Sequence, residues 1–242
     1  MNIKKHVPNF ITCLNLLCGC VGIVFVFGNQ LVMASYLIGL AAVLDFMDGM
    51  VARLLKAYSE IGKQLDSLAD MVTFGLLPGM MLYKLIEFSA TGNSFLPWFA
   101  FLVPVFSAIR LAKFNIDVRQ TDSFIGVPTP ANAMLIASLP LISTFEPQLN
   151  AAVFGTLITN CFFLIGLTLV MSLLMVAELP LFSLKFKNLQ WSKNRIRFIF
   201  LSCSLILLIL FHFVAIPVII FLYIILSIIH NFSTSNSVKN NP

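Results

Sequence analysis

Long apolar stretches alternate with short polar interruptions along almost the whole chain. A bilayer core of roughly 30 Å requires about 20 apolar residues per helix, so stretches of this length are typical of membrane-spanning helices. Gly28-Asn29 separates the first two stretches, and Pro128 and Pro130 open the fifth. The pattern predicts about eight helices. Their expected bounds are 10–28, 31–55, 60–86, 95–116, 129–145, 150–176, 196–213 and 215–230.

Composition supports this prediction and excludes two classes of protein. Hydrophobic residues make up 59% of the 242-residue chain and charged residues only 10%, whereas a soluble domain carries about 25% charged residues. The polar side chains are too few to cover a water-facing globule, which excludes an ordinary cytosolic enzyme. The 24 phenylalanines exclude a disordered chain. We therefore expect an all-α fold, a polytopic transmembrane helix bundle that forms one membrane domain over residues 1–242.

The basic residues gather on one side of the predicted topology. Of the 15 lysines and arginines, 14 lie in terminal segments or in every second connection, and only Lys84 lies on the other side. Because cytoplasmic loops are enriched in Lys and Arg, both termini are expected in the cytoplasm of a protein integral to the cell (inner) membrane. The net charge of +5 reflects this topology and predicts no nucleic-acid partner. The 14 residues are Lys4, Lys5, Arg53, Lys56, Lys63, Arg110, Lys113, Arg119, Lys185, Lys187, Lys193, Arg195, Arg197 and Lys239.

Four carboxylates stand in or beside apolar stretches where single charges are costly. Asp45 and Asp48 lie near the end of the second predicted span, and Asp66 and Asp70 lie near the start of the third. An unpaired carboxylate in hydrocarbon costs at least about 2.5–3.5 kcal/mol, so something positive must compensate. The spacings i, i+3 and i, i+4 place each pair on one helix face. Because the two spans form an antiparallel hairpin, we expect the pairs to converge toward the cytoplasmic end.

Oxygen ligands of this kind suit Mg²⁺, Mn²⁺ or Ca²⁺ rather than Zn²⁺, since no His or Cys lies among them. Gly49, Ala52 and Gly62 share the same helix faces and leave room for a bulky ligand to approach the backbone. Arg53 lies beyond the first pair, where its guanidinium can neutralise a phosphate oxygen. This combination predicts a phosphate-transfer centre at the membrane surface. The alternatives are a proton or cation relay in a cation-coupled transporter and a hydrogen-bonded structural network.

The transporter interpretation predicts ionisable residues deeper in several helices, or repeated broken helices. Neither is visible in the sequence, which favours the phosphate-transfer centre.

The sequence Asp45–Asp70 reads D-x2-D-G-x2-A-R-x8-G-x3-D-x3-D, with eight specified residues at fixed spacing. It resembles, with no position missing, the signature of the CDP-alcohol phosphatidyltransferases.

The resemblance implies a core of six transmembrane helices, usually in a homodimer. It also implies that two divalent metals, Mg²⁺ or Mn²⁺, bind the four aspartates and that Asp70 serves as the catalytic base. Gly49, Arg53 and Ser59 would contact the CDP-linked lipid, with Ala52 and Gly62 beside them. Asn15 on the first span is a further candidate for nucleotide binding, although a helix–helix hydrogen bond accounts for it equally well.

Relative to that core, about 8–190 would be the catalytic bundle and about 196–230 two extra C-terminal helices. Residues 231–242 would form a loose tail rich in Ser and Asn.

Four further stretches resemble the phosphatidylserine synthase branch of this family, and together they cover the N-terminal 133 residues. That resemblance implies CDP-diacylglycerol and L-serine as substrates. Other acceptors in the family's chemistry are glycerol phosphate, an inositol compound and choline, and they remain alternatives. The four stretches are PNFITCLNLLCG at Pro8–Gly19, DSLADMVTFGLLPG at Asp66–Gly79, RLAKFN at Arg110–Asn115 and FIGVPTPANA at Phe124–Ala133.

Serine is a small zwitterion, so its pocket requires a cation for the carboxylate and an acceptor for the ammonium group. Arg110, Lys113 and Asn115 supply such groups on the predicted cytoplasmic side, although the two cations are also explained as a topology signal. Lys113 departs from the branch, which often has Arg there, and it lacks the planar fork that binds a carboxylate through two hydrogen bonds. The glycine and prolines of Phe124–Pro130 fit either a helix-capping turn or a substrate-facing loop.

Overall fold

The computed structural model describes residues 6–90, 95–117, 123–146, 155–182 and 190–239. Five residues of the predicted basic set, Lys4, Lys5, Arg119, Lys185 and Lys187, lie outside the described residues, as does the expected start of the sixth helix at 150–154. Helices account for nearly all of what is described, and the all-α prediction is confirmed.

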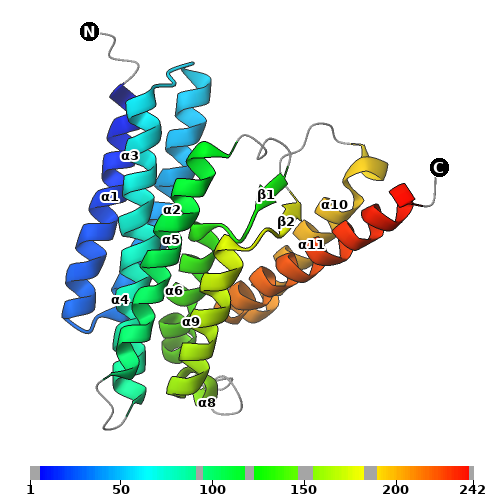
Figure 1. Cartoon of the computed structure of the whole chain (residues 1–242). Coiled ribbons are helices and arrows are strands. Elements are labelled where there is room, and N and C mark those ends of the chain that lie inside the picture. Colours follow the sequence, from blue (N-terminus) through cyan, green and yellow to red (C-terminus); the bar gives the residue numbers. More distant parts are fainter. Residues whose placement is uncertain (1–5, 91–94, 118–122, 147–154, 183–189, 240–242) are drawn as a thin grey trace.

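The helices follow one another up and down the molecule, and two short strands, Ser123–Ile125 and Pro180–Phe182, pair with each other (Figure 1). The N-terminal elements are α1 (His6–Phe27), α2 (Leu31–Leu54), α3 (Glu60–Asp70), the π-helix η2 (Met71–Leu76), α4 (Leu77–Ser89), the 3-10 helix η3 (Leu96–Phe101) and α5 (Leu102–Ile116). The C-terminal elements are β1 (Ser123–Ile125), α6 (Thr129–Phe145), α8 (Gly155–Ile158), α9 (Cys161–Val176), β2 (Pro180–Phe182), α10 (Trp191–Phe211), the 3-10 helix η5 (His212–Val214) and α11 (Ala215–Lys239).

Five helical segments in the described chain are long and apolar enough to cross a membrane, which indicates a multi-pass integral membrane protein. The helices 129–145 and 161–176 are apolar but shorter. Apart from residue 230, the last two predicted spans fall within one 36-residue apolar segment, which folds back on itself at η5. The five segments are His6–Phe27, Leu31–Leu54, Glu60–Ser89, Leu96–Ile116 and Asn194–Ile229.

The expected single helix over 150–176 is wrong in its described part. The chain forms α8, leaves the helix at Thr159-Asn160 and starts again as α9. The side-chain oxygen of Asn160 accepts hydrogen bonds from the backbone N–H groups of Phe162 and Phe163. An N-terminal cap of this kind favours a new helix start over continuation of the old helix.

Small residues let α1 approach the third membrane segment closely. A side chain at Gly19 would lie 2.5 Å from the Thr73 hydroxyl, and one at Gly22 would lie 2.5 Å from Leu77. Such contacts are typical of packing between membrane helices, where short side chains bring backbones together. The Thr73 hydroxyl donates to the Asn15 carbonyl at 3.1 Å. The polar face of α1 is thereby fixed against α3 and η2.

A π-helix begins directly after Asp70. In η2 the backbone bonds span five residues, as in the bond from the Leu77 N–H to the Val72 carbonyl. Wide turns of this type inside an α-helical run are rare and recur at functional sites. The turn separates the polar α3 from the apolar α4 within one continuous membrane segment.

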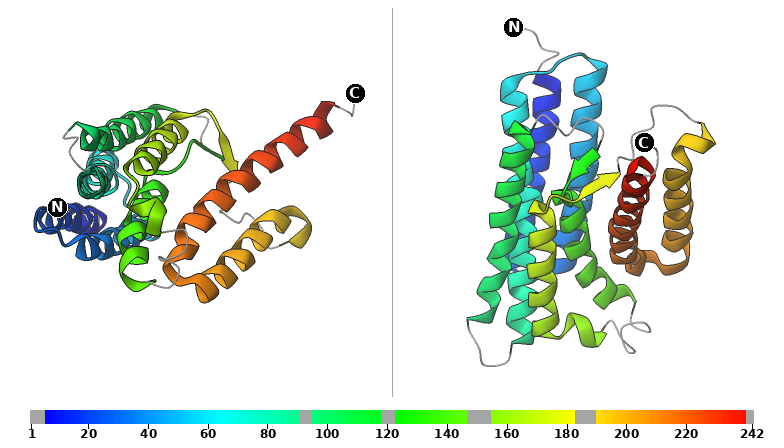
Figure 2. Two further views of the ribbon diagram at one scale, coloured as in Figure 1. Left: turned by 90° about the horizontal axis from the view of Figure 1, so that it is seen from below. Right: turned by 45° about the vertical axis from the view of Figure 1, so that its right-hand side comes forward.

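The extra C-terminal helices are present as α10 and α11, which form a hairpin that leans away from the main bundle (Figure 2). Hydropathy did not predict β1 and β2, whose antiparallel pairing sets Phe124 opposite Leu181. The hairpin contacts this strand pair through the Tyr223 hydroxyl, which donates to the Phe182 carbonyl at 2.7 Å. The helix α11 continues to Lys239, past the boundary expected at residue 230.

Candidate active site

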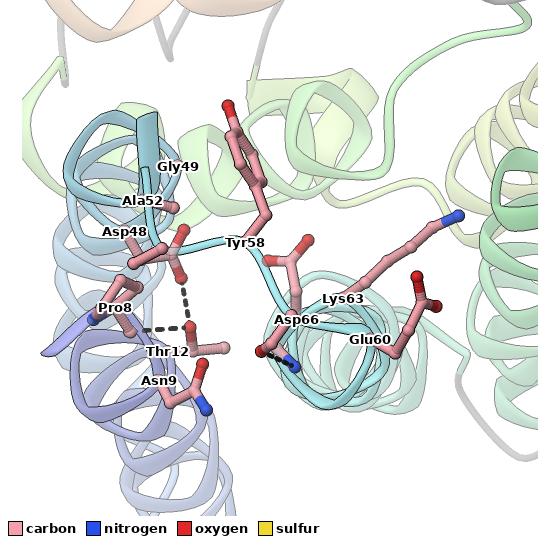
Figure 3. A pocket seen from close by; sticks show the side chains of 13 residues that line it. Pro8, Asn9, Thr12, Asp48, Gly49, Ala52, Tyr58, Glu60, Lys63 and Asp66 are labelled. Atoms are coloured by element: carbon pink, nitrogen blue, oxygen red, sulfur yellow. Dashed lines mark hydrogen bonds between the residues drawn. The ribbon is translucent and has the colours of Figure 1, made fainter. Parts of the chain in front are cut away.

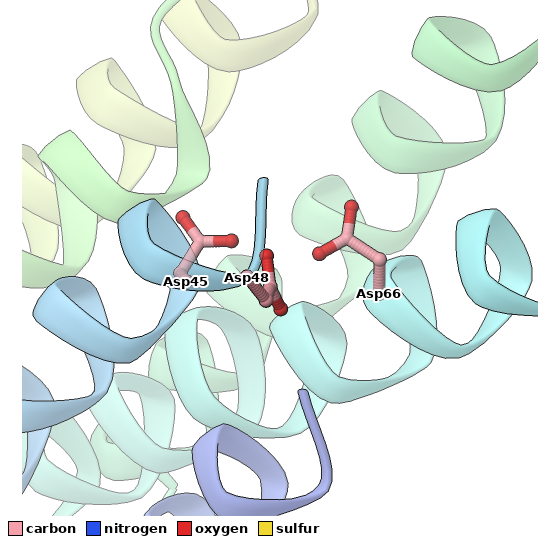
Figure 4. Close-up of side chains that lie close together, drawn as sticks. All are labelled: Asp45, Asp48 and Asp66. Atoms are coloured by element: carbon pink, nitrogen blue, oxygen red, sulfur yellow. The ribbon is translucent and has the colours of Figure 1, made fainter. Parts of the chain in front are cut away.

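Three carboxylates from two helices converge at the end of the bundle where α2 ends and α3 begins (Figure 4). Asp45 and Asp48 project from α2, and Asp66 faces them from α3. One oxygen from each carboxylate lies within 4.8 Å of the others. The i, i+3 spacing places Asp45 and Asp48 on one face of α2, and the antiparallel hairpin brings that face opposite Asp66. This convergence was expected from the sequence.

The surroundings of these carboxylates fit a divalent cation. Asp48 is 6% exposed and accepts a hydrogen bond of 2.6 Å from the Thr12 hydroxyl. One oxygen of Asp66 is buried without a hydrogen-bond partner. Buried charge without partners is costly, and a cation held by several oxygens removes that cost. The donor set is oxygen only, as Mg²⁺ and Mn²⁺ prefer.

The fourth predicted ligand, Asp70, stands outside this group of three. It lies one turn further along α3, is 8% exposed and accepts a hydrogen bond of 3.2 Å from the Asn15 amide. Its carboxyl group remains within electrostatic range of Asp45 and Asp66. Asp70 thus lies next to the three carboxylates but outside their cluster, and its hydrogen-bond partner is Asn15 on α1.

A cavity of about 560 Å³ opens beside the carboxylates, between the start of α1, the end of α2 and the start of α3 (Figure 3). Asp48 and Asp66 lie in its wall. Of the six residues expected to bind the CDP-linked lipid, four line it. They are Gly49, Ala52, Ser59 and Gly62.

Arg53 and Asn15 are not part of this lining. The exposed Arg53 side chain folds back, and its Nε donates to the Gly49 carbonyl at 2.9 Å. The Asn15 amide is engaged with Asp70, although its own oxygen is buried without a partner. Both side chains are therefore hydrogen-bonded to residues of the predicted site, Gly49 and Asp70, rather than directed into the cavity.

Ser59 and Gly62 shape the floor of the cavity as the start of α3. The Ser59 hydroxyl caps this helix by accepting from the Gly62 N–H at 3.0 Å. A side chain at position 62 would meet Ser59 Oγ and Asn9 Oδ1, each at 2.9 Å. A larger residue at position 62 would therefore displace the side chains of Asn9 and Ser59 as well as narrow the cavity.

A second cavity, of about 310 Å³, lies between α5, β1 and the end of α9. Arg110 and Lys113 line it together with the carboxylates of Asp117 and Glu178. Arg110 is 7% exposed and lies within electrostatic range of Asp70, the fourth predicted ligand of the carboxylate centre. The cavity is large enough for a small amino acid.

Asn115, the third residue expected in a serine pocket, does not line this cavity. Its amide donates to Ser67 Oγ at 2.8 Å, and its carbonyl accepts from Lys63 Nζ at 2.9 Å. These two bonds hold the end of α5 against α3. Asn115 is therefore engaged with α3 and lies outside the lining that Arg110 and Lys113 share.

Sequence reasoning overlooked two polar residues of α1, Asn9 and Thr12, that line the first cavity. Thr12 lies one helical turn before Asn15, and this i, i+3 spacing was a signal that α1 presents a polar face. Thr12 and Asn15 bond to Asp48 and Asp70, respectively. The first helix therefore orients a carboxylate on each of the other two.

The fold and the site together define a class: a polytopic helical membrane protein with an oxygen-only carboxylate centre beside a cavity. The family profile of the CDP-alcohol phosphatidyltransferases matches residues 5–171. This match spans more than half of the chain, and the chain belongs to that family.

Curated relatives named CDP-diacylglycerol–serine O-phosphatidyltransferase are similar to the chain. The protein from Helicobacter pylori strain J99 is 34% identical over 203 residues, which is 82% of this chain and 80% of the relative. The protein from Bacillus subtilis strain 168 is 36% identical over 151 residues, or 61% of this chain and 81% of the relative. The protein from Methanocaldococcus jannaschii is 34% identical over 130 residues, or 54% and 58%.

Proposed function

We propose that this protein transfers the phosphatidyl group from CDP-diacylglycerol to the hydroxyl of L-serine, giving phosphatidylserine and CMP. The observation that carries the proposal is the convergence of three carboxylates beside a cavity of about 560 Å³. Membership of the family supports the reaction class, and the names of the relatives support serine as the acceptor.

Two divalent cations, Mg²⁺ or Mn²⁺, would be held by Asp45, Asp48, Asp66 and Asp70. When bound, such ions supply charge that polarises a phosphoryl group and stabilises the departing phosphate. The unpartnered oxygen of Asp66 and the 4.8 Å cluster support three of these ligands. Asp70 would take part from its position one turn away, within electrostatic range of the other carboxylates.

Asp70 also serves as the general base in this proposal. It accepts the proton of the serine hydroxyl as that oxygen forms a bond to the phosphorus that bears diacylglycerol. The bond from that phosphorus to the CMP oxygen breaks, and the electron pair leaves with CMP. A hydroxyl is a poor nucleophile at neutral pH, so a positioned base is required. Its hydrogen bond from Asn15 supports Asp70 in this role, because it fixes the carboxylate's orientation.

The first cavity would receive the CDP portion of the lipid. Gly49 and Ala52 offer a wall without bulky side chains, and Ser59 and Gly62 form the opposite side at the start of α3. Arg53 would turn from its bond with the Gly49 carbonyl to a phosphate oxygen. Asn15 would contribute its unpartnered side-chain oxygen, Oδ1, from outside the present lining.

Serine would occupy the second cavity, with its carboxylate bound by Arg110. Lys113 lines the same cavity and adds positive charge at its exposed side. Asn115 would act from outside, by holding α5 against α3 through Ser67 and Lys63. Arg110 is also close enough to Asp70 for their charges to interact, which supports a serine hydroxyl directed toward the base.

The site would face the cytoplasm from the cell (inner) membrane, with both termini on that side. The start of α1, the end of α2 and the end of α5 lie at one end of the bundle (Figure 1), which agrees with the bias of basic residues. The proposal retains the homodimer implied by the family resemblance.

The decisive experiment incubates the purified protein with CDP-diacylglycerol, a divalent metal and separate acceptors. The acceptors are L-serine, glycerol phosphate, an inositol compound and choline. We expect CMP release only with serine, and only when Mg²⁺ or Mn²⁺ is present. CMP release that requires a different alcohol would overturn serine as the acceptor, and no CMP release with any of them would overturn the enzymatic proposal.

An Asp45→Ala variant tests the metal site, with Glu87→Gln as a matched control. Glu87 is exposed and pairs with Lys84 at the far end of the same membrane segment as Asp66. Asp45→Ala should lose its response to metal titration, whereas Glu87→Gln should keep it. An Asp45→Ala protein with normal turnover and normal metal response would contradict the site.

A further inference from the structure

One buried amide in the described bundle has no partner for either of its polar atoms. Asn132 on α6 is 0% exposed, and neither Nδ2 nor Oδ1 makes a hydrogen bond. Leaving a buried polar group unpaired costs about 1–3 kcal/mol. Such a group in a folded protein calls for a ligand or another explanation.

The position of Asn132 relates it to the second cavity. It lies one helical turn after Thr129, so the two side chains share a face of α6. The Thr129 hydroxyl is also fully buried and accepts a hydrogen bond of 3.4 Å from Arg110 Nη1. Arg110 lines the cavity, and its Nε is buried without a hydrogen-bond partner, as are the polar atoms of Asn132. Thr129 therefore bonds one buried, partly unsatisfied side chain, Arg110, and lies one helical turn from another, Asn132.

Helix α6 is a neighbour of the elements that hold the carboxylate centre. The helix packs against α2, which carries Asp45, and against η2, which follows Asp70. Arg110 lies within electrostatic range of Asp70. Asn132 does not itself line the second cavity, but it is buried one helical turn from Thr129, the residue that bonds Arg110 of that cavity.

The two unsatisfied groups differ in what they can bind. A guanidinium has donors only and suits a carboxylate, whereas an amide oxygen accepts hydrogen bonds and suits an ammonium group. An inositol or a glycerol phosphate has no ammonium group to offer. The pair matches an α-amino acid, which carries both groups on one carbon.

We propose that Asn132 is a specificity-determining residue for the acceptor. Its Oδ1 accepts a hydrogen bond from the α-ammonium group of serine, while Arg110 binds the α-carboxylate. This inference rests on the proposed function, because it assigns a role within the serine site. The inference adds Asn132 on α6 to the serine-binding residues that the sequence predicted on α5, which are Arg110, Lys113 and Asn115.

The variant Asn132→Leu keeps the size of the side chain and removes both polar atoms. We expect the KM for serine to rise about 10- to 100-fold, as for loss of a hydrogen bond to a charged group. The KM for CDP-diacylglycerol should stay within about twofold of the wild-type value. Thermal unfolding should not move to lower temperature, since the variant buries no unpaired polar group.

Two further variants make the result decisive. Ser204→Ala is the matched control, because Ser204 also has a buried, unpaired polar atom but lies in the remote α10. It should leave the KM for serine unchanged. Asn132→Ala repeats the test with a smaller side chain if leucine prevents folding.

Inhibition by 3-hydroxypropionate, which lacks the ammonium group, identifies what Asn132 binds. Asn132→Leu should weaken serine binding but leave inhibition by 3-hydroxypropionate within about twofold of the wild-type value. Equal weakening of both compounds would overturn the assignment to the ammonium group. An unchanged KM for serine in both Asn132 variants would overturn the whole inference and leave the amide with a buried water only.

These outcomes are distinct from failure of the proposed function. That failure appears first, in the wild-type protein, as CMP release that does not depend on serine. The Asn132 variants are interpreted against a wild-type protein whose serine dependence has been measured in the same assay.

Discussion

The Asn15 amide donates a hydrogen bond of 3.2 Å to Oδ1 of Asp70, joining side chains that are 55 residues apart in the chain. The bond crosses from α1 to α3 at the point where the π-helix η2 begins. Because α1 is packed against this segment through Gly19, the amide has little freedom to move away. Asn15 therefore determines the direction in which the proposed base faces.

Replacing Asn15 with Leu should lower kcat more than it raises the KM for CDP-diacylglycerol. Groups that orient the partners of a metal site typically contribute about 10- to 100-fold in activity, and we expect a loss of that size. Steady-state kinetics with each substrate varied separately measure the split. An increase in the KM for CDP-diacylglycerol at unchanged kcat would instead assign Asn15 to nucleotide binding alone.

Replacing Asp70 with Asn should reduce kcat by about 10²- to 10⁴-fold, the usual contribution of a general base. The amide is almost the same size as the carboxyl group and can still contact Asn15, so folding should be preserved. Binding of CDP-diacylglycerol, measured directly without serine, should persist. Near-native turnover by this variant would remove the base assignment.

Replacing Thr12 with Val should weaken the response to metal and leave the fold intact. The Thr12 hydroxyl donates to Asp48 at 2.6 Å, and second-layer partners of this kind affect metal affinity by about 10- to 100-fold. The metal concentration for half-maximal activity should rise accordingly. Thr168→Val is the matched control, because the buried Thr168 hydroxyl bonds only to the Leu164 carbonyl of its own helix.

The sequence predicted the helical class and the carboxylate centre for reasons that are local. Spans follow from apolar length, and Asp45, Asp48 and Asp66 meet because spacing along two neighbouring helices determines their faces. Asp70 follows the same spacing, yet its nearest polar partner comes from α1. The spacing of residues along α2 and α3 gives no information on contacts with α1, so the bond between Asn15 and Asp70 could not be predicted from it.

Features that depend on distant segments escaped prediction. The strand pair requires Phe124 to meet Leu181, and neither tripeptide has the length or alternation that indicates a strand. Asn115 was expected beside Arg110 because the two are close in sequence, but its bonds go to Ser67 and Lys63 on α3. The isolation of Asn132 is visible only when all the atoms around it are placed.

Gly49 offers a test that separates access to the cavity from stability. A methyl group at this position would meet no atom within 4 Å, and the same is true of Gly39 on the same helix. Alanine is favoured over glycine in helix interiors by about 1 kcal/mol, so Gly49→Ala and Gly39→Ala should each retain or raise stability.

Only Gly49 lines the cavity, so only Gly49→Ala should impair binding of CDP-diacylglycerol. We expect its KM for this lipid to rise about tenfold, as is typical when a well-fitted site is overfilled. Thermal unfolding and lipid-dependent kinetics of the two variants measure the difference. If both alanines behave alike, the cavity between α1, α2 and α3 does not hold the nucleotide, and the similarity of this segment to the family signature reflects helix packing instead.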